Sequence, residues 1–294
     1  MTSPITVACA ADNKFAVLAA TMIKSIEVST PIDHHPTRVY LVENKISRSR
    51  LTKIIRSIDL ARIDLHILTP DWSRLHTLDP IPAHRKLTAY HRLLLPELLP
   101  HSIKRILYLD CDILVNAPLM PLWQTQILPD HIVAAAQDRN AWTVGCEWGG
   151  GVPNYAEFGM KKDAPYFNSG VLLIDLEKWR NQDISSRVVR INAENESHVR
   201  WLDQYGLNVA LHHKWTQLDK SWNSYPKDSH SDRKIIHFVS RKPISPDYEG
   251  PYQDLFFDVL DRTQWKGRRP SNLPLPAFFP ESLRYYVRQA IQPW

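Results

Sequence analysis

Strand-like and helix-like segments alternate along the first part of the chain, and this alternation constrains the fold more than any other feature of the sequence. Short apolar runs are separated by stretches whose apolar residues recur every three or four positions, as in an amphipathic helix. The predicted strands span residues 5–11, 38–43, 63–68 and 105–110, and the predicted helices span residues 15–28, 47–58 and 86–99. Strands joined by helices of this length predict an α/β fold with a mostly parallel sheet and helices on both faces. A functional site is expected at the carboxyl ends of the strands.

The turn after the first predicted strand contains no glycine. It reads Ala10-Ala11-Asp12-Asn13. Neither the GxGxxG motif that binds dinucleotides nor the GxxxxGK[ST] loop that binds phosphates is present. The sequence therefore excludes enzymes that use nicotinamide or flavin through a Gly-rich turn, and P-loop NTPases.

Composition narrows the class further. The chain has 294 residues, of which 44% are hydrophobic, which excludes a disordered protein. Its longest apolar runs are far shorter than the ~20 residues that cross a bilayer. The N-terminus lacks the basic region of a signal peptide. Three widely spaced cysteines without a CxxC argue against a disulfide framework or a zinc ribbon. These features predict a cytoplasmic protein.

The formal net charge of +5 is unevenly distributed. Residues 1–261 carry 30 basic and 30 acidic side chains, so the whole excess lies in residues 262–294. A nucleic-acid-binding domain would spread basic residues over a folded face, so no nucleic-acid partner is expected. The sequence predicts a domain over 1–261 and a basic, aromatic tail over 262–294. An amphipathic helix predicted from Pro280 either contacts an anionic membrane surface or packs on the domain.

The most informative segment is an apolar strand that ends in Asp110-Cys111-Asp112. Residues two apart on an extended chain point to the same side, so the two carboxylates can converge while Cys111 points away. Two carboxylates held close together are unfavourable unless a cation or a proton lies between them. Hard oxygen ligands suit Mg²⁺ or Mn²⁺, and such ions commonly also bind substrate phosphates. The alternative is a solvated turn.

Three other places carry polar residues where a cleft is expected. Asn168 and Gly170 precede a strongly apolar segment and either face a cleft or form a turn. Asp203 and Gln204 begin a predicted helix, where Asp203 is either a functional carboxylate or an N-cap. His237 ends a short predicted strand and is either structural or a third metal ligand beside two carboxylates.

A Gly-rich segment has two tryptophans in it or beside it. Four of the nine glycines occur between Gly145 and Gly151, with Trp142 and Trp148 beside them. Glycine frees the backbone and tryptophan offers a flat face to a sugar ring, so this segment predicts a loop that binds the acceptor. The alternative is an irregular insertion.

Taken together, these motifs resemble retaining glycosyltransferase family 8, which includes lipopolysaccharide galactosyl- and glucosyltransferases and glycogenin. The resemblance runs in order from the first strand to about residue 260. The matched segments are Ala10-Ala-Asp-Asn with Phe15, His84 with Tyr90-His-Arg92, Ile106-Leu-Tyr-Leu-Asp110-x-Asp112, Pro121-Leu-Trp123, Tyr166-Phe-Asn168-Ser-Gly170 with Trp179-Arg180, Asp203-Gln204 with Asn208, Trp222-Asn223 and His237-Phe238.

The resemblance implies a GT-A fold, a UDP-sugar donor and Mn²⁺ (or Mg²⁺) as cofactor. It implies retaining transfer of galactose or glucose to a glycan or glycolipid acceptor. Because the basic, aromatic tail would hold the enzyme on the inner face of the membrane, the expected acceptor is a membrane glycan such as lipopolysaccharide. By motif position, Asp110, Asp112 and His237 would bind the metal, Ala10, Asp12, Phe15 and Lys242 the nucleotide, and Arg92, Asn168, Asp203 and Gln204 the donor sugar, with Gln204 and Asp203 as catalytic residues.

One motif departs from the family pattern. The turn after His237 usually carries a glycine that lets the backbone approach the diphosphate, but this chain has Ser240 there, one residue less before Lys242, and Ile244 in place of tryptophan. A non-catalytic protein that binds a sugar nucleotide or a glycan is therefore the alternative function. A nucleotidyltransferase is disfavoured because its Gly-rich first loop is absent.

Overall fold

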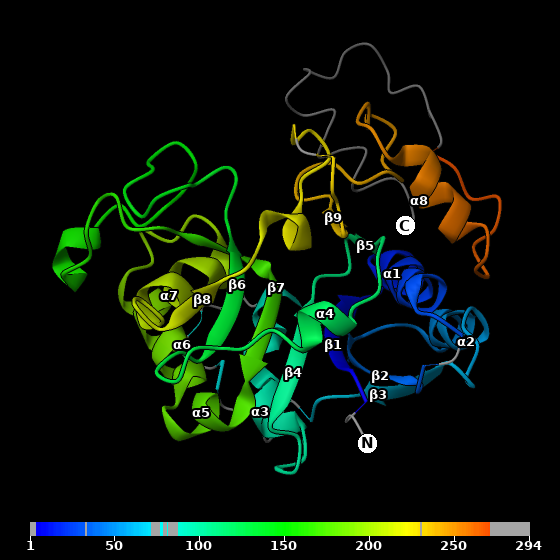
Figure 1. Ribbon diagram of the computed structural model, residues 1–294, viewed down its shortest axis with the longest axis horizontal. Helices are drawn as coiled ribbons and strands as arrows, with labels where there is room; N and C mark the ends of the chain where they lie inside the picture. The colour runs from blue at the N-terminus through cyan, green and yellow to red at the C-terminus, as the bar shows by residue number, and fades with distance from the viewer. Residues whose placement is uncertain are drawn as a thin grey trace.

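The computed structural model describes residues 4–32, 34–71, 77–78, 81, 88–229 and 231–270 (Figure 1). A seven-stranded sheet forms its centre, in the order β3-β2-β1-β4-β7-β6-β8. The strands are β1 (Thr6–Asp12), β2 (Thr37–Asn44), β3 (Ile63–Leu68), β4 (Arg105–Leu109), β6 (Val133–Gln137), β7 (Phe167–Asp175) and β8 (Trp215–Gln217). Only β7 runs against the others, because it pairs antiparallel with both β4 and β6 while the remaining pairs are parallel. The predicted, mostly parallel sheet is confirmed.

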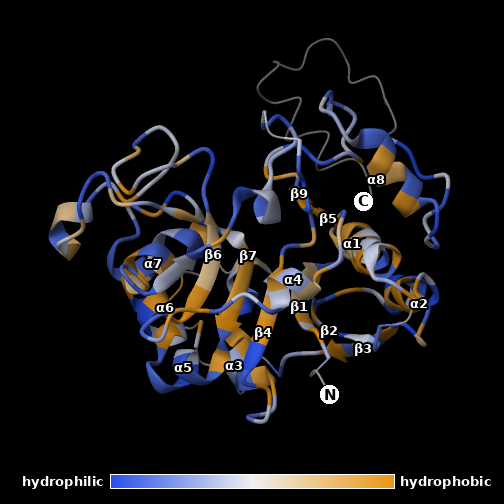
Figure 2. Ribbon diagram, viewed as in Figure 1, coloured by the Kyte–Doolittle hydropathy of each residue, from blue (hydrophilic) through white to orange (hydrophobic). Residues whose placement is uncertain are grey.

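Helices cover both faces of this sheet. They are α1 (Ala16–Ser29), α2 (Arg48–Arg56), α3 (Leu95–Leu98), α4 (Met120–Trp123), α5 (Leu176–Asn181), α6 (Ile184–Glu194), α7 (Leu202–Ala210) and α8 (Gln253–Leu260), with 3₁₀ helices η2 (Thr88–Leu94), η3 (Tyr155–Phe158) and η4 (Lys220–Asn223). One hydrophobic core joins α1 and α8 to the sheet, and a second joins η2 and α5–α7 to its other face. Successive β1 residues alternate between the two cores, as the pleat requires. Figure 2 shows the apolar strands between these layers.

A second, two-stranded sheet lies above the central one in Figure 1. Its strands β5 (Ile113–Val115) and β9 (Ile235–His237) pair antiparallel, with Ile113 opposite His237. Asp112 immediately precedes β5. This pairing therefore brings a histidine from late in the chain beside the Asp-Cys-Asp segment.

Most predicted elements are confirmed, including the four strands and the helices at 15–28 and 47–58. The single helix expected over 86–99 is wrong, because the described part folds as the 3₁₀ helix η2 followed by the short α3. Pro96 has no backbone N–H, and its ring would clash with the carbonyl four residues before it in a continuous α-helix. Residues 86 and 87 lie outside the described residues.

A second difference concerns Asn168 and Gly170, which lie inside β7 and not in a turn before it. Because β7 is antiparallel to its neighbours, its first residues lie at the edge of the sheet where the parallel strands end. The residues expected to face a cleft therefore reach the expected edge from within a strand.

The described start of the tail packs on the domain. Trp265 is buried in the core that contains α1 and α8, and the Gln264 backbone N–H donates to the Ser57 hydroxyl at 2.9 Å. Arg269 pairs with Asp261 at 2.7 Å. The amphipathic helix predicted from residue 280 lies outside the described residues. Within the described residues, the model contains no helix that is both long enough and apolar enough to cross a bilayer.

Candidate active site

The functional residues expected from the sequence gather where the parallel strands end. Asp12 ends β1 and Asp110 follows β4, while Asn168 lies near the start of the antiparallel β7. Asp203 and Gln204 lie in the first turn of α7, and His237 ends β9. These residues therefore lie together at the carboxyl edge of the sheet, where the sequence predicts the site.

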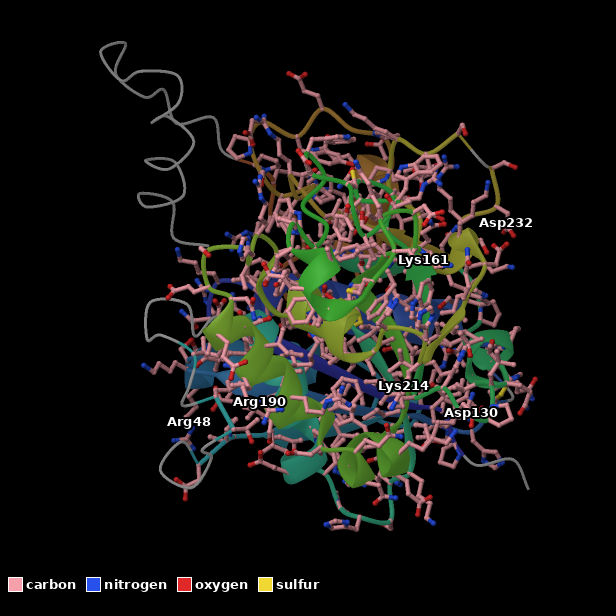
Figure 3. All side chains as sticks on the ribbon, turned by 90° about the vertical axis from the view of Figure 1, so that its left-hand side faces the viewer. Arg48, Asp130, Lys161, Arg190, Lys214 and Asp232 are labelled. Carbon is pink, nitrogen blue, oxygen red and sulfur yellow. The ribbon has the colours of Figure 1, made fainter. Side chains whose placement is uncertain are left out.

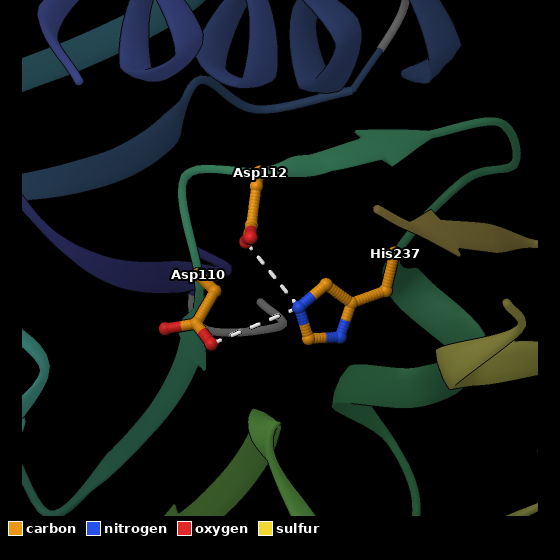
Figure 4. A group of neighbouring side chains, drawn as sticks. All are labelled: Asp110, Asp112 and His237. Carbon is orange, nitrogen blue, oxygen red and sulfur yellow. Dashed lines mark ion pairs between the residues drawn. The ribbon is translucent and has the colours of Figure 1, made fainter. Parts of the chain in front are cut away.

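Asp110, Asp112 and His237 form one cluster. Each offers a ligand atom, and these atoms lie within 4.8 Å of one another. The His237 Nε2 atom is 3.3 Å from Asp112 Oδ1 and 3.8 Å from Asp110 Oδ2 (Figure 4). Cys111 points away, as expected, and its thiol donates to the Ala10 carbonyl. The donor set of two carboxylates and one imidazole suits a Mn²⁺-like ion.

The space for this cluster depends on a glycine in β7. A Cβ atom on Gly170 would overlap the imidazole of His237 and lie 2.9 Å from Asp110 Oδ2. No side chain fits at this position while His237 keeps its place. Gly170 is therefore required by close approach rather than by an unusual backbone conformation.

Lys242 reaches the same cluster from the turn that departs from the family pattern. Its Nζ atom is 2.5 Å from Asp112 Oδ2 and also donates to the Phe238 carbonyl. Burial alone would raise the pKa of Asp112, but Lys242 and His237 outweigh it and hold that pKa well below its usual range. Ser240 does not have a positive φ, so the backbone conformation at this position does not require a glycine.

Arg92 connects the metal-ligand cluster to α7. Its guanidinium is 3% exposed, with Nη2 at 3.0 Å from Asp110 Oδ1 and Nε at 2.8 Å from Asp203 Oδ2. It also donates to the Ser169 carbonyl. Tyr108 donates to the same Asp110 oxygen, so Oδ2 is the oxygen left facing His237. The N-cap alternative for Asp203 is wrong: Trp201 is the N-cap residue, and Asp203 pairs with Arg92.

The two ion-pair partners have shifted pKa values. Burial opposes the charge of Arg92, but Asp110 and Asp203 outweigh it and raise the pKa of the guanidinium above its usual range. Burial raises the pKa of Asp203 to about 6, although Arg92 acts in the opposite direction. Perturbed carboxylates of this kind are typical of functional sites.

Gln204 belongs to a buried hydrogen-bond network. Its Oε1 atom accepts from the Ser169 backbone N–H at 3.0 Å and from Asn168 Nδ2 at 3.1 Å. Its Nε2 atom donates to Asp138 Oδ2 at 3.1 Å, and Asn168 Nδ2 donates to the same oxygen at 3.0 Å. Sequence analysis missed Asp138, although it follows the apolar strand β6 just as Asp110 follows β4.

A pocket of about 330 Å³ adjoins the cluster and contains residues expected to bind the nucleotide. Its lining includes Ala10, Asp12, Phe15, Arg92, Tyr108, Asp110 and Asp112. Asp12 Oδ1 accepts from the backbone N–H groups of Lys14 and Phe15, which fixes the turn that leads into α1. Of the four residues expected at the nucleotide, three line this pocket, and Lys242 contacts Asp112.

A larger pocket, about 630 Å³, lies at the opposite edge of the sheet, where β1, β2 and β4 begin. Basic side chains of Arg38, Lys104 and Arg105 line it together with Trp123. None of the residues predicted to bind the metal, the nucleotide or the donor sugar lines it. Size alone would favour this pocket, but the carboxylates, the histidine and the buried amides all lie at the other edge.

The Gly-rich segment is packed against the domain. Ala141, Val144 and Val152 share a small hydrophobic core with Tyr166 and Tyr205. Trp201, which sequence analysis left without a role, donates from its indole nitrogen to the Gly149 carbonyl at 2.7 Å. The segment between Gly145 and Gly151 forms turns without a helix or strand and is anchored to the domain by these contacts.

Three tryptophans on and beside this segment are exposed. Trp142, Trp148 and Trp201 expose 54%, 80% and 55% of their surface. Trp201 lies two residues before Asp203, and Trp142 lies four residues after Asp138. The exposed aromatic residues thus adjoin the buried polar network along the chain.

The fold is a GT-A fold, and its carboxyl edge carries two carboxylates and an imidazole that could hold a metal ion. The solved structure of galactosyltransferase LgtC in complex with donor and acceptor sugar analogs has the same fold, with a TM-score of 0.72 at 24% identity over 96% of this chain and 99% of LgtC. The bifunctional glycosyltransferase WbbM matches with a TM-score of 0.72 at 18% identity, over 90% of this chain and 51% of WbbM.

Sequence comparison assigns the family. The model of glycosyl transferase family 8 matches residues 6–246, and the chain belongs to this family. General stress protein A of Bacillus subtilis is 26% identical over 88% of this chain and 93% of its own length. Glycosyltransferase GlyF of Streptococcus pneumoniae is also 26% identical, over 73% of this chain but only 47% of GlyF.

Proposed function

We propose that this protein transfers a hexose, galactose or glucose, from a UDP-sugar to a glycan acceptor with retention of anomeric configuration. The main support is that Arg92 forms ion pairs with Asp110, in the metal-ligand cluster, and with the buried Asp203, which lies beside Gln204. A nucleotide site and a sugar site are thereby held against each other. Membership of glycosyl transferase family 8 supports the same reaction class.

The nucleotide half of the reaction belongs to the metal cluster and the adjoining pocket. Asp110, Asp112 and His237 would hold Mn²⁺ or Mg²⁺, which supplies Lewis-acid stabilisation of the departing UDP. Ala10, Asp12 and Phe15 line the pocket proposed for the uridine. In this proposal, Lys242 leaves Asp112 when the nucleotide binds and forms an ion pair with the diphosphate instead.

The sugar half belongs to Arg92, Asn168, Asp203 and Gln204. Asp203 and Arg92 offer an acceptor and a donor for sugar hydroxyls. Gln204 Oε1 already accepts two well-formed hydrogen bonds, and an amide oxygen is a weak nucleophile. These contacts support a front-side transfer, in which Gln204 stabilises developing positive charge near the anomeric carbon, over a covalent intermediate.

The acceptor proposed is a glycan, such as lipopolysaccharide or another cell-surface glycan. The exposed Trp142, Trp148 and Trp201 offer flat apolar faces on which pyranose rings stack. The LgtC structure, solved with donor and acceptor sugar analogs, supports a two-substrate site on this fold.

We also propose that residues 262–294 place the enzyme on the cytoplasmic face of an anionic membrane. The support is that this segment carries the whole excess of positive charge. Co-sedimentation with anionic vesicles tests this location by comparing the parent with a form that lacks residues 271–294 and carries Arg262→Gln and Lys266→Gln at exposed positions. Equal sedimentation of both forms would contradict it.

UDP release from a panel of UDP-sugars with Mn²⁺ tests the reaction, with Asp112→Asn as the test variant. Asp130→Asn is the matched control, because Asp130 is exposed near the start of β6, at the opposite edge of the sheet (Figure 3). We expect Asp112→Asn to lower the rate by roughly 100-fold or more, since several kcal/mol of charge stabilisation are lost. The control variant should match the parent. Binding of a UDP-sugar without any release of UDP would support the non-catalytic alternative.

A further inference from the structure

Asn223 lies between the metal-ligand cluster and the buried network around Gln204. It ends η4, is 1% exposed, and is not itself a ligand in the cluster. Its Oδ1 atom is 2.9 Å from His237 Nδ1, and its Nδ2 atom donates to Asn168 Oδ1 at 2.8 Å. The side chain thus contacts one residue from each half of the proposed site.

The direction of these hydrogen bonds can be deduced from backbone groups. The Gly170 backbone N–H donates to Asn168 Oδ1 at 2.9 Å, so that atom must be the oxygen of the amide. Asn223 must then present its NH₂ group to Asn168, which leaves its own oxygen facing His237. An oxygen in that place can only accept, so His237 Nδ1 must carry a proton.

Backbone N–H groups also fix the orientation of Asp138, at the other end of this hydrogen-bond network. Asp138 Oδ1 accepts from the backbone N–H groups of Asn140 and Ala141, and Asp138 Oδ2 accepts from Asn168 Nδ2. Rotation of the Asn168 amide would therefore place its oxygen against Asp138 Oδ2 and its NH₂ group against the Gly170 N–H and the Asn223 NH₂ group. The network has one consistent arrangement from Asp138 to His237.

The backbone holds the two partners in register. The His237 N–H donates to the Ser224 carbonyl at 2.8 Å, and the Ser224 N–H donates to the Ile235 carbonyl at 3.0 Å. Asn223 and His237 are therefore joined through main chain as well as side chain. These backbone hydrogen bonds hold Asn223 in a fixed position relative to the imidazole of His237.

We propose that Asn223 is a positioning residue that fixes His237 with Nδ1 protonated and Nε2 directed at Asp110 and Asp112. The inference rests on the proposed metal role of that cluster. Partners of this kind, which hold the second nitrogen of a ligating histidine, orient the ring and set its tautomer. Through Asn168, the same residue ties the histidine ligand to the amide of Gln204.

The first test examines His237 in the metal-free parent protein. Long-range ¹H–¹⁵N NMR on protein with ¹⁵N-labelled histidine, at alkaline pH, reports which ring nitrogen carries the proton; loss of the signal in His237→Gln assigns it. We expect the Nδ1–H tautomer. The Nε2–H tautomer would overturn the inference, and this result does not depend on whether the protein binds a metal.

The second test measures Mn²⁺ affinity by electron paramagnetic resonance of the free ion, without nucleotide. Asn223→Ala should weaken binding by about 10- to 100-fold. Asn223→Asp keeps an acceptor for Nδ1 but places a second oxygen against Asn168 Oδ1, so it should retain clearly more affinity than Asn223→Ala. Asn154→Ala removes a buried asparagine that bonds Tyr205 and Asn195, and should leave affinity unchanged.

Each outcome is decisive. Parent-like affinity in a folded Asn223→Ala variant would overturn the proposal, as would a loss in Asn223→Asp equal to that in Asn223→Ala. If Asn223→Ala does not fold, Asn223→Asp and the tautomer of the parent still decide the question. A parent protein that binds no Mn²⁺ but shows the Nδ1–H tautomer would refute the proposed metal role and leave the positioning of His237 intact.

Discussion

Gln204 shows how individual residues in the site are held for one task. Both of its amide ends are engaged, since Oε1 accepts from Ser169 and Asn168 and Nε2 donates to Asp138. Because hydrogen bonds already fix the amide, its dipole does not have to reorient during the reaction. It is suited to stabilise charge rather than to form a bond.

Replacement of Gln204 by alanine tests this role. We expect Gln204→Ala to slow transfer by roughly 100- to 1,000-fold, the usual effect of losing one preorganised polar group, while the Kd for the UDP-sugar stays near the parent value. Steady-state kinetics and calorimetry measure the two quantities. Unchanged activity would remove Gln204 from the mechanism, and complete loss of turnover would favour a nucleophilic role.

The raised pKa of Asp203 predicts a pH dependence. With a pKa of about 6, Asp203 is neutral in more acidic solution and negative above it. Pairing with Arg92 and acceptance of a sugar hydroxyl both need the negative form. Activity at saturating Mn²⁺ should therefore rise through pH 6 and level off above it. Asp203→Asn should be weakly active and should lack this rise; an identical pH profile in the variant would contradict the assignment.

The same shift has a consequence for stability. The folded carboxyl binds its proton more tightly than the unfolded one, whose pKa is 3.8. The free energy of unfolding should therefore fall as pH rises from about 4 to about 6, because the native state then binds more protons than the unfolded state.

At the scale of elements, the antiparallel strand β7 decides how the site is assembled. Its first residues supply Asn168 to the polar network and Gly170 to the space beside His237. A parallel strand would have placed these residues at the opposite edge. Strand periodicity identifies an apolar strand but neither its direction nor its first residue, which is why Asn168 was expected just before the strand, facing a cleft or in a turn.

Gly170→Ala tests the role of close approach in β7. The added methyl group would overlap the His237 imidazole, so we expect a loss of about 1–3 kcal/mol in the free energy of unfolding and clearly weaker Mn²⁺ binding. Gly159→Ala is the control, because its methyl group meets no atom within 4 Å and its φ of 65° strains alanine, so this variant loses stability without contact with His237. Denaturant titration and Mn²⁺ titration give the two values. Parent-like Mn²⁺ affinity in Gly170→Ala would show that His237 need not keep this position.

At the scale of the whole molecule, the sequence predicted the sheet, most of its helices and the residues that meet at its edge. Those predictions depend on local patterns: apolar strands that end in acid, and helices that begin with polar residues. Asp138 and Asn223 received no role because their importance lies in hydrogen bonds across 30 and 55 positions of sequence to Asn168. The direction of such bonds follows from tertiary structure and cannot be read from spacing.

The arrangement also explains how a body with balanced charge can handle a doubly charged leaving group. The described cations at the site, Arg92 and Lys242, are already paired with Asp110, Asp203 and Asp112. Net positive charge for the diphosphate would therefore come from the bound metal and from release of Lys242. In the proposed mechanism, the metal cluster and the buried network around Gln204 act together in retaining transfer.

The most direct measurement of that central claim is the anomeric configuration of the first sugar released. ¹H NMR can follow the protein with UDP-galactose or UDP-glucose and Mn²⁺ in the absence of acceptor, before the free sugar equilibrates. Both donors carry an α-linked sugar, so the account predicts that the α-anomer appears first and that its appearance requires Mn²⁺. Release of the β-anomer first would contradict retaining transfer.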